Sequence, residues 1–169
     1  MIYFQCDYEE GCHPAILKKL QETNLEQTVG YSMDPYCASA REKIKKAIAR
    51  SDADVHFLVG GTQTNMTVIA AALKPWQGAI CADTGHIACH ETGAVEATGH
   101  KVLALPSEDG KITAEQIEET VKKHYADGSH EHIVQPGMVY ISFPTESGTL
   151  YSKQELTDIY AVCKAHDMP

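Results

Sequence analysis

The sequence lacks long hydrophobic runs and has few positive charges. No stretch approaches the roughly 20 apolar residues of a membrane-spanning helix, and the first eight residues have neither the basic nor the apolar region of a signal peptide. Lysines and arginines number 14 against 23 aspartates and glutamates, a formal net charge of -9. Such a chain is poorly suited to phosphate backbones or anionic membranes. We therefore expect no nucleic-acid partner, no membrane partner and a cytoplasmic location.

The sequence also lacks a C-x-x-C pair, although it contains six cysteines. They are scattered, and several lie in apolar stretches typical of a protein core; they are Cys6, Cys12, Cys37, Cys81, Cys89 and Cys163. A chain of 169 residues with 43% hydrophobic content can bury a core without disulfides. We therefore expect a reduced α/β protein.

Residues 1–50 are predicted to form an N-terminal arm with two helices. Pro14 suits a first helical position, and Ile16, Leu17 and Leu20 follow it at helical spacing. A second apolar stripe predicts a helix over 35–50. The arm thus precedes a second part, residues 51–169.

Residues 51–169 alternate short apolar runs with amphipathic stretches, which is typical of βαβ units and a mainly parallel sheet flanked by helices. The predicted strands are 55–59, 79–82, 101–105 and 138–142. The predicted helices are 62–73, 86–98, 113–124 and 152–166. Two of these helices begin with capping boxes, Thr113 with Gln116 and Ser152 with Glu155.

A glycine pair, Gly60 and Gly61, stands between a predicted strand and a predicted helix and is followed by Thr62. Glycines allow close approach of the backbone, and a helix N-terminus offers unpaired N–H donors, so this turn is a candidate phosphate site. It matches neither the G-x-G-x-x-G nor the Walker pattern. The alternative is a glycine turn with a threonine N-cap, and the residues alone leave both readings open.

His86 and Glu91 follow the predicted strand 79–82. In an open α/β sheet the carboxyl ends of the strands face the ligand, so both side chains are candidates for binding or proton transfer. A zinc site built on His86, Cys89 and His90 is an alternative. The order is not H-E-x-x-H and no further ligand cluster follows, so the sequence favours a site without a metal.

Glu146 belongs to a polar loop, Phe143 to Thr149, which follows the predicted strand 138–142. Its position predicts that it lies at the same edge of the sheet as the other candidates. Alternatively, Pro144 and Gly148 only build the turn into the next helix.

Taken together, these segments resemble the threonine aldolase and β-eliminating lyase family of pyridoxal-phosphate enzymes of fold type I. The order and spacing of the motifs carry the resemblance, which runs through Cys6-Asp7, Tyr31 to Pro35, Gly61-Thr62 with Asn65, His86-Ile87 with Glu91, Leu105 to Ser107 with Asp109-Gly110, and Glu146 with Gly148. The resemblance implies an incomplete large domain of the aspartate aminotransferase-like fold, preceded by an N-terminal helical segment.

The resemblance also implies roles for single residues. Gly61 and Thr62, with Asn65 nearby, would hold the phosphate of pyridoxal 5'-phosphate. His86 would stack on the pyridine ring, and Glu91 would be a candidate acid or base. The family further implies contacts to the substrate or to a neighbouring subunit, and the residues concerned here are Cys6, Tyr31 and Glu146.

The activity implied is cleavage of a small β-hydroxy-α-amino acid to glycine and an aldehyde, in a homo-oligomer of two or four subunits. Cys6 stands where the family has serine and Ser32 where it has glycine, so β-elimination of an amino acid stays open as an alternative. A third reading is a non-catalytic assembly or binding module of the same fold.

The main departure from the family is that this sequence lacks the lysine that would form the Schiff base with the cofactor. Lys101 begins a predicted strand, and Lys153 and Lys164 lie in a predicted helix, so none is placed for this role. We therefore expect this chain to be inactive alone and to be the N-terminal portion of a longer enzyme.

Overall fold

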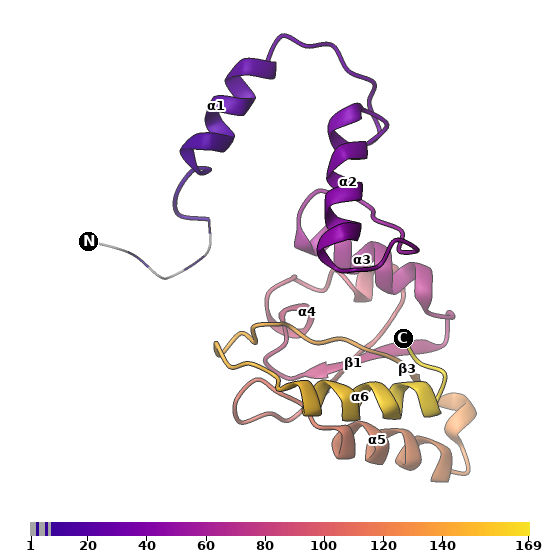
Figure 1. Ribbon diagram of the computed structural model, residues 1–169. Helices are drawn as coiled ribbons and strands as arrows, with labels where there is room; N and C mark the ends of the chain where they lie inside the picture. The colour runs from indigo at the N-terminus through magenta and orange to yellow at the C-terminus, as the bar shows by residue number, and fades with distance from the viewer. Residues whose placement is uncertain (1–2, 4–5, 7) are drawn as a thin grey trace. The chain divides into compact units, whose positions relative to one another are not determined.

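The computed structural model describes residues 3, 6 and 8–169 (Figure 1). These residues form two compact units, Met1–Phe57 and Leu58–Pro169, which are described separately below. Within the described residues, no helix is both long and apolar enough to cross a membrane.

The first unit contains two helices, α1 (Pro14–Thr23) and α2 (Pro35–Ala47), as the sequence predicts. The Asp34 carboxylate caps α2 by accepting the Cys37 N–H at 2.8 Å. Neither helix buries a residue within this unit. The second helix ends earlier than predicted, and Ala49 just beyond it has a left-handed backbone (φ 53°).

The second unit contains a three-stranded parallel sheet, in the order β2-β1-β3. Its strands are β1 (Gln77–Ala82), β2 (Val102–Leu105) and β3 (Gln135–Val139). Its helices are α3 (Gly61–Ala72), α4 (His86–Cys89), α5 (Ala114–Ala126) and α6 (Lys153–Ala165), with short 3-10 turns at Glu96–Thr98 and His130–His132. This arrangement confirms the predicted parallel α/β class.

The central strand β1 is buried on both faces, because successive side chains of a strand point to opposite sides. Ile80 and Ala82 pack in the cluster that includes residues of α5 and α6. Ala79 and Cys81 pack in a second cluster with residues of α3 and α4. Figure 1 shows these helices as layers on either side of the sheet. Burial raises the pKa of the Cys81 thiol to about 12, so this cysteine is a neutral core residue.

The predicted strand 55–59 is wrong. This segment has no regular secondary structure and spans the boundary between the two units. Side chains satisfy its backbone instead: Arg41 Nε donates to the Val55 carbonyl at 3.1 Å, and the Val59 N–H donates to Gln63 Oε1 at 3.0 Å. An apolar run forms a strand only where a neighbouring strand accepts its hydrogen bonds.

The predicted helix 86–98 is also wrong in its length. Only His86–Cys89 is helical, and a 3-10 turn at Glu96–Thr98 follows after a break. Thr92 (φ 56°) and Gly93 (φ 75°) adopt left-handed conformations that a helix does not allow. The break turns Glu91 inward, where it is 5% exposed.

The strand β3 begins three residues earlier than predicted, at Gln135 rather than Met138. It contains Pro136, a residue that argues against a strand in sequence reasoning because it lacks an N–H donor. β3 is an edge strand of this three-stranded sheet, where proline is tolerated, and its pairing with β1 is irregular between Gly78 and Ala79.

An ion pair ties the loop after β2 to the start of α6. Lys111 Nζ lies 2.7 Å from Glu155 Oε1 and 3.5 Å from Asp109 Oδ2. The neighbouring Ile112 N–H donates to the buried Tyr151 hydroxyl at 2.9 Å. Both predicted capping boxes are present, so Glu155 also caps α6. The Lys111 ammonium lowers the pKa of Glu155 to about 2, and hydrogen bonds from Ser152 add to this effect.

The core predicts a large cost for truncating Ile117, which is fully buried on α5 (0% exposed). We expect Ile117→Ala to lower the free energy of unfolding by about 2–5 kcal/mol, because it leaves a cavity between the sheet and α6. Val68→Ala, on a half-exposed side chain of α3, is the control and should cost less than about 1 kcal/mol. Urea unfolding followed by circular dichroism measures both; equal losses would contradict the packing described.

The lowered pKa of Glu155 predicts acid sensitivity. Its folded pKa lies below the ordinary value of 4.5, so its contribution to stability is full above pH 4.5 and is lost as the pH falls toward 2. Glu155→Gln keeps the capping geometry but removes the charge, so its stability should fall less steeply over this range. Glu108→Gln, at an exposed loop position, should retain the wild-type slope. Thermal unfolding between pH 2 and pH 6 measures the three proteins.

Candidate functional site

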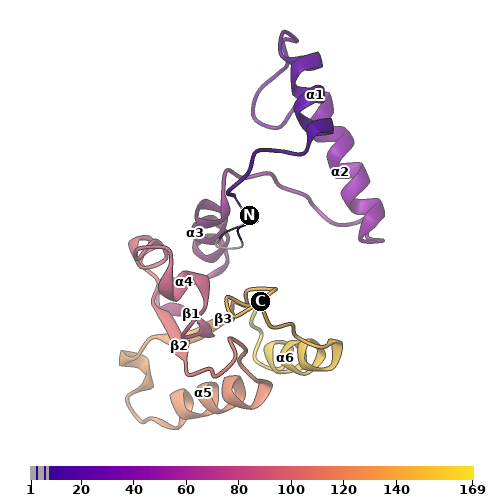
Figure 2. The same ribbon diagram turned by 90° about the vertical axis from the view of Figure 1, so that its left-hand side faces the viewer.

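The candidate site lies beyond the carboxyl end of β1, where the chain turns through Asp83 to Gly85 into α4. The backbone N–H of Asp83 continues the sheet pairing by donating to the Leu105 carbonyl at 2.7 Å. The turn therefore has a fixed position relative to the sheet, and α4 begins directly at His86. Figure 2 looks along the strands, with α3 and α4 above them and α5 and α6 below.

Glu91 is the centre of the site. Its side chain is completely buried, and Oε1 accepts a hydrogen bond from Asn65 Nδ2 at 2.5 Å. The same oxygen lies 2.9 Å from His86 Nδ1. The other oxygen, Oε2, is buried without a partner among the described residues. The structure thus brings together three of the predicted site residues, from α3, from α4 and from the break that follows α4.

The contact with Glu91 orients the imidazole of His86. Glu91 Oε1 acts as an acceptor, as it also does toward Asn65, so Nδ1 donates in this pair and Nε2 points away from Glu91. The His86 side chain is 39% exposed, so one end of the ring is anchored and the other reaches solvent. This arrangement suits a ring that stacks on a flat ligand or exchanges a proton.

The glycine turn before α3 is open at its surface. Gly60 has φ +78°, and a Cβ built at Gly60 or Gly61 would meet no atom within 4 Å. The N-cap makes no side-chain hydrogen bond, so no described side chain at this position caps the first N–H groups of α3. Thr62 is exposed beside them. The expected threonine N-cap is wrong, because Gly60 holds that position, whereas the glycine turn of the same alternative is present.

Asn65 connects this turn to Glu91. It lies one helical turn after Gly61, so both residues share a face of α3. Because Asn65 donates to Glu91, the start of α3 is held against the residues that follow β1. The candidate phosphate turn and the His86–Glu91 pair therefore belong to one arrangement of hydrogen bonds.

Tyr140 is a further residue of this region that the sequence reasoning missed. It directly follows β3, and burial raises the pKa of its phenol. The Glu91 carboxylate raises this pKa further, while hydrogen bonding by Ser142 and Asn65 opposes the shift. The sequence signal was present, since Tyr140 is the first residue after a strand, but the strand was predicted to run on to Ser142.

The loop Phe143 to Thr149 has a structural part, while a functional role for Glu146 stays a prediction. Thr149 Oγ1 donates to the Asp109 carbonyl at 2.7 Å, and the buried Thr145 packs against Gly110, so part of the loop is structural. Glu146 is exposed, and its only hydrogen bond in the described chain is from Ser142 Oγ at 3.1 Å. Ser142 thereby links Glu146 to the surroundings of Tyr140.

The residues of the zinc alternative make other contacts. Cys89 Sγ donates to the Asp83 carbonyl at 2.9 Å, and the rings of His86 and His90 lie 5.7 Å apart and tilted. Across the part of the chain that the structure describes, no three histidine, cysteine, aspartate or glutamate side chains are arranged to hold a metal ion.

Two predicted site residues, Cys6 and Tyr31, belong to the first unit, which is described by itself. Cys6 is partly buried and Tyr31 is fully exposed, with a left-handed backbone (φ 59°). Asp7, which follows Cys6 in the resemblance, lies outside the described residues. The roles of these residues stay predictions.

The chain is similar to known proteins along nearly its whole length. A family model described as beta-eliminating lyase matches residues 8–169. Two low specificity L-threonine aldolases, from Pseudomonas sp. (strain NCIMB 10558) and Pseudomonas aeruginosa, are each 30% identical over 163 residues, which is 95% of this chain and 46% of theirs.

Solved structures agree with this result. A threonine aldolase from Leishmania major is 49% identical with a TM-score of 0.90, over 96% of this chain and 46% of that one. A PLP-bound C-S lyase from Staphylococcus hominis, 14% identical with a TM-score of 0.57 over 91% of this chain and 39% of that one, shares the fold. The chain thus spans slightly under half the length of these relatives. It belongs to the beta-eliminating lyase family and has the fold of the corresponding part of the fold-type-I pyridoxal-phosphate enzymes.

Proposed function

We propose that this chain forms the N-terminal part of a pyridoxal-phosphate lyase that cleaves a β-hydroxy-α-amino acid to glycine and an aldehyde. The observation that carries the proposal is the buried Glu91 carboxylate, held by Asn65 and His86 at the carboxyl end of β1. The similarity to threonine aldolases, one of them 49% identical, supports the choice of reaction. The whole protein would act in the cytoplasm as a homo-oligomer of two or four subunits.

The residues present fit pyridoxal phosphate. The backbone at Gly60 and Gly61 is open where a side chain would begin, so a phosphate could approach the uncapped N–H groups of α3. Thr62 adds a hydroxyl at this position. The buried, unpartnered Oε2 of Glu91 is a second sign of an incomplete polar site, since buried polar atoms are normally paired.

When bound, pyridoxal phosphate supplies an electron sink that stabilises a carbanion at the α-carbon of an amino acid. The chain's own residues would position the cofactor and exchange protons with the bound molecules. His86 would present its ring to the cofactor, with Glu91 fixing the orientation of that ring through Nδ1. Glu91 would be the candidate acid or base, because its second oxygen is buried without a partner among the described residues and is therefore available to a proton or to a ligand.

The lysine that holds the cofactor would come from outside this stretch of sequence. All twelve lysines lie in the described residues, and Lys111 alone stands in a loop after a strand on the carboxyl side of the sheet. Its hydrogen bond to Glu155 raises the pKa of Lys111, which keeps it protonated and unsuited to attack on an aldehyde. We therefore propose that residues 1–169 alone are inactive.

Substrate contacts are proposed for three further residues. Glu146 is exposed beside Ser142 and could meet the polar groups of an amino acid. Cys6 and Tyr31 would contact the substrate or a neighbouring subunit, as in the family resemblance. Cys6 in place of serine makes β-elimination the principal alternative reaction, and an assembly module without chemistry the second.

The reaction is tested on the longer gene product that contains these residues. We expect purified full-length protein to show the visible absorption of bound pyridoxal phosphate and to convert L-threonine to glycine and acetaldehyde. Pyruvate and ammonia from β-substituted amino acids would instead show β-elimination. If the cofactor is bound but neither set of products is formed, the lyase proposal is contradicted. Absence of cofactor absorption would favour an assembly module. Residues 1–169 alone should release no glycine from threonine.

The role of Glu91 is tested by Glu91→Gln in the full-length protein. The amide oxygen can still accept from Asn65 and His86, so a structural role would survive the change. A proton-transfer role predicts a fall in kcat of roughly 100-fold or more with little change in KM. Glu96→Gln, at an exposed glutamate five residues on, should retain full activity. Urea unfolding of residues 1–169 carrying Glu91→Gln should stay within about 1 kcal/mol of wild type; full kcat in this variant would refute the role.

A further inference from the structure

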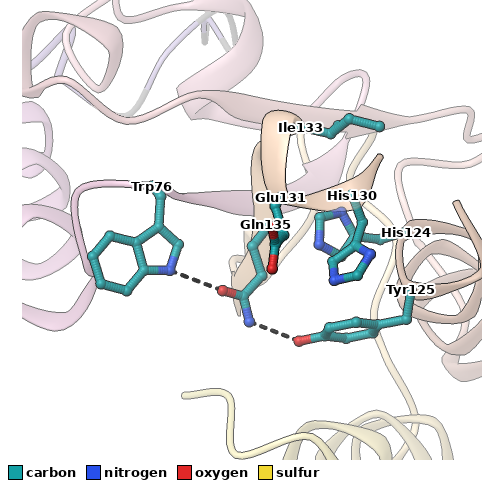
Figure 3. Close-up of a pocket in the computed structure, with 7 residues that line it drawn as sticks. All are labelled: Trp76, His124, Tyr125, His130, Glu131, Ile133 and Gln135. Atoms are coloured by element: carbon teal, nitrogen blue, oxygen red, sulfur yellow. Dashed lines mark hydrogen bonds between the residues drawn. The ribbon is translucent and has the colours of Figure 1, made fainter. Parts of the chain in front are cut away.

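A pocket lies at the opposite edge of the sheet from Glu91. Trp76 directly precedes β1 and Gln135 begins β3, so this pocket is at the amino ends of the strands. It has a volume of about 340 Å³, within the range of small-ligand sites. The pocket is lined by aromatic and polar side chains, which include Trp76, His124, Tyr125, His130, Glu131 and Gln135 (Figure 3).

Hydrogen bonds hold two aromatic rings in fixed positions. The Trp76 indole N–H donates to Gln135 Oε1 at 3.0 Å, and Gln135 Nε2 donates to the Tyr125 hydroxyl at 2.7 Å. Figure 3 shows Gln135 bridging the two rings. Trp76 is nevertheless 59% exposed and Tyr125 53% exposed. A ligand would meet preorganised aromatic surface and lose little side-chain entropy on binding.

Two histidines contribute polar surface to the pocket. Burial lowers the pKa of His124, with His130 adding to the effect, so His124 is uncharged at neutral pH. His130 Nδ1 lies 2.9 Å from the Asp127 carbonyl, which only accepts, so this nitrogen carries the hydrogen. Nε2 is therefore the nitrogen of this ring that can accept a hydrogen bond.

The charges around the pocket favour a cation. Glu131 supplies a carboxylate, and no lysine or arginine lines the pocket. Aromatic faces attract cations within about 6 Å, most strongly those of tryptophan. In this chain Lys74 Nζ already lies 5.8 Å from the centroid of the Trp76 ring, so a guanidinium ion would either replace Lys74 on this ring or stack on the ring of Tyr125. An anion would be repelled by the Glu131 carboxylate and by the overall charge of -9.

We propose that this pocket binds a guanidinium group, either of a small metabolite or of an arginine side chain. A guanidinium ion is flat enough to stack on the rings of Trp76 or Tyr125, and its fork of N–H donors matches the Glu131 carboxylate. The acceptor nitrogen of His130 takes a further N–H. This site is separate from the proposed cofactor site, and its test does not depend on cofactor or on activity.

The test uses fluorescence, because Trp76 is the sole tryptophan of the sequence. Residues 1–169 are titrated with butylguanidine, with butylurea of the same shape but no charge, and with butylamine. We expect a saturable change with butylguanidine and binding roughly tenfold weaker for butylurea. Equal binding of butylurea, equal binding of butylamine, or no saturable change with butylguanidine would each overturn the proposal.

Two variants separate the pocket from general charge attraction. Glu131→Gln should weaken butylguanidine binding roughly fivefold or more, because it removes the charged acceptor. Glu119→Gln removes the same charge from an exposed position on α5 and should leave the affinity within about twofold. Circular dichroism checks that both variants are folded. Equal weakening in both would refute the site.

The source of the guanidinium is resolved with a blocked tripeptide, acetyl-Ala-Arg-Ala-amide. Binding at least as tight as that of butylguanidine supports the proposal and assigns a protein arginine as the ligand. Binding of butylguanidine without the tripeptide supports the proposal and assigns a small molecule.

Discussion

Burial of β1 on both faces is the constraint on which the rest of this structure depends. A parallel strand has to be covered on each side, and here α5 and α6 cover one face while α3 and α4 cover the other. Because β1 is hydrogen-bonded to β2 on one side and to β3 on the other, the residues at its two ends have well-defined positions relative to the sheet. The candidate cofactor site stands at its carboxyl end and the aromatic pocket at its amino end.

The burial of Glu91 follows from that packing. The chain leaves β1, makes one short helix and then turns through two left-handed residues, Thr92 and Gly93. A continuous helix here would carry Glu91 on the helix surface, whereas the break buries it beside Asn65 and His86. Burying a carboxylate is unfavourable unless it is hydrogen-bonded, and only one of its oxygens is satisfied. Such an arrangement is typical of a site that meets a ligand or moves a proton.

Much of the fold could be predicted because its signals are local. The capping boxes at Thr113 and Ser152 fixed two helix starts to within a residue, since the cap is a contact between neighbours in sequence. The segment 55–59 could not be placed, because a strand is defined by a partner and not by its own apolar residues. The start of β3 at Gln135 was also not predicted, because the pairing of Gly78 with Pro136 and of Ala79 with Met138 is a contact between strands distant in sequence.

The candidate site shows the same division between local and distant contacts. His86 and Glu91 are five residues apart and could be paired from their place after a strand, whereas Asn65 came from family resemblance and Tyr140 was missed. The contact of Asn65 with Glu91 joins residues 26 apart in sequence, and Tyr140 reaches the site from a different strand. The Trp76 pocket likewise joins Trp76 to Gln135, 59 residues apart. Parallel topology creates both groupings, because it aligns the ends of strands that are distant in sequence. Candidate functional residues of this fold are therefore sought where the ends of neighbouring strands meet. At β1 these are Glu91 with its partners beyond the carboxyl end, and Trp76 with Gln135 at the amino end.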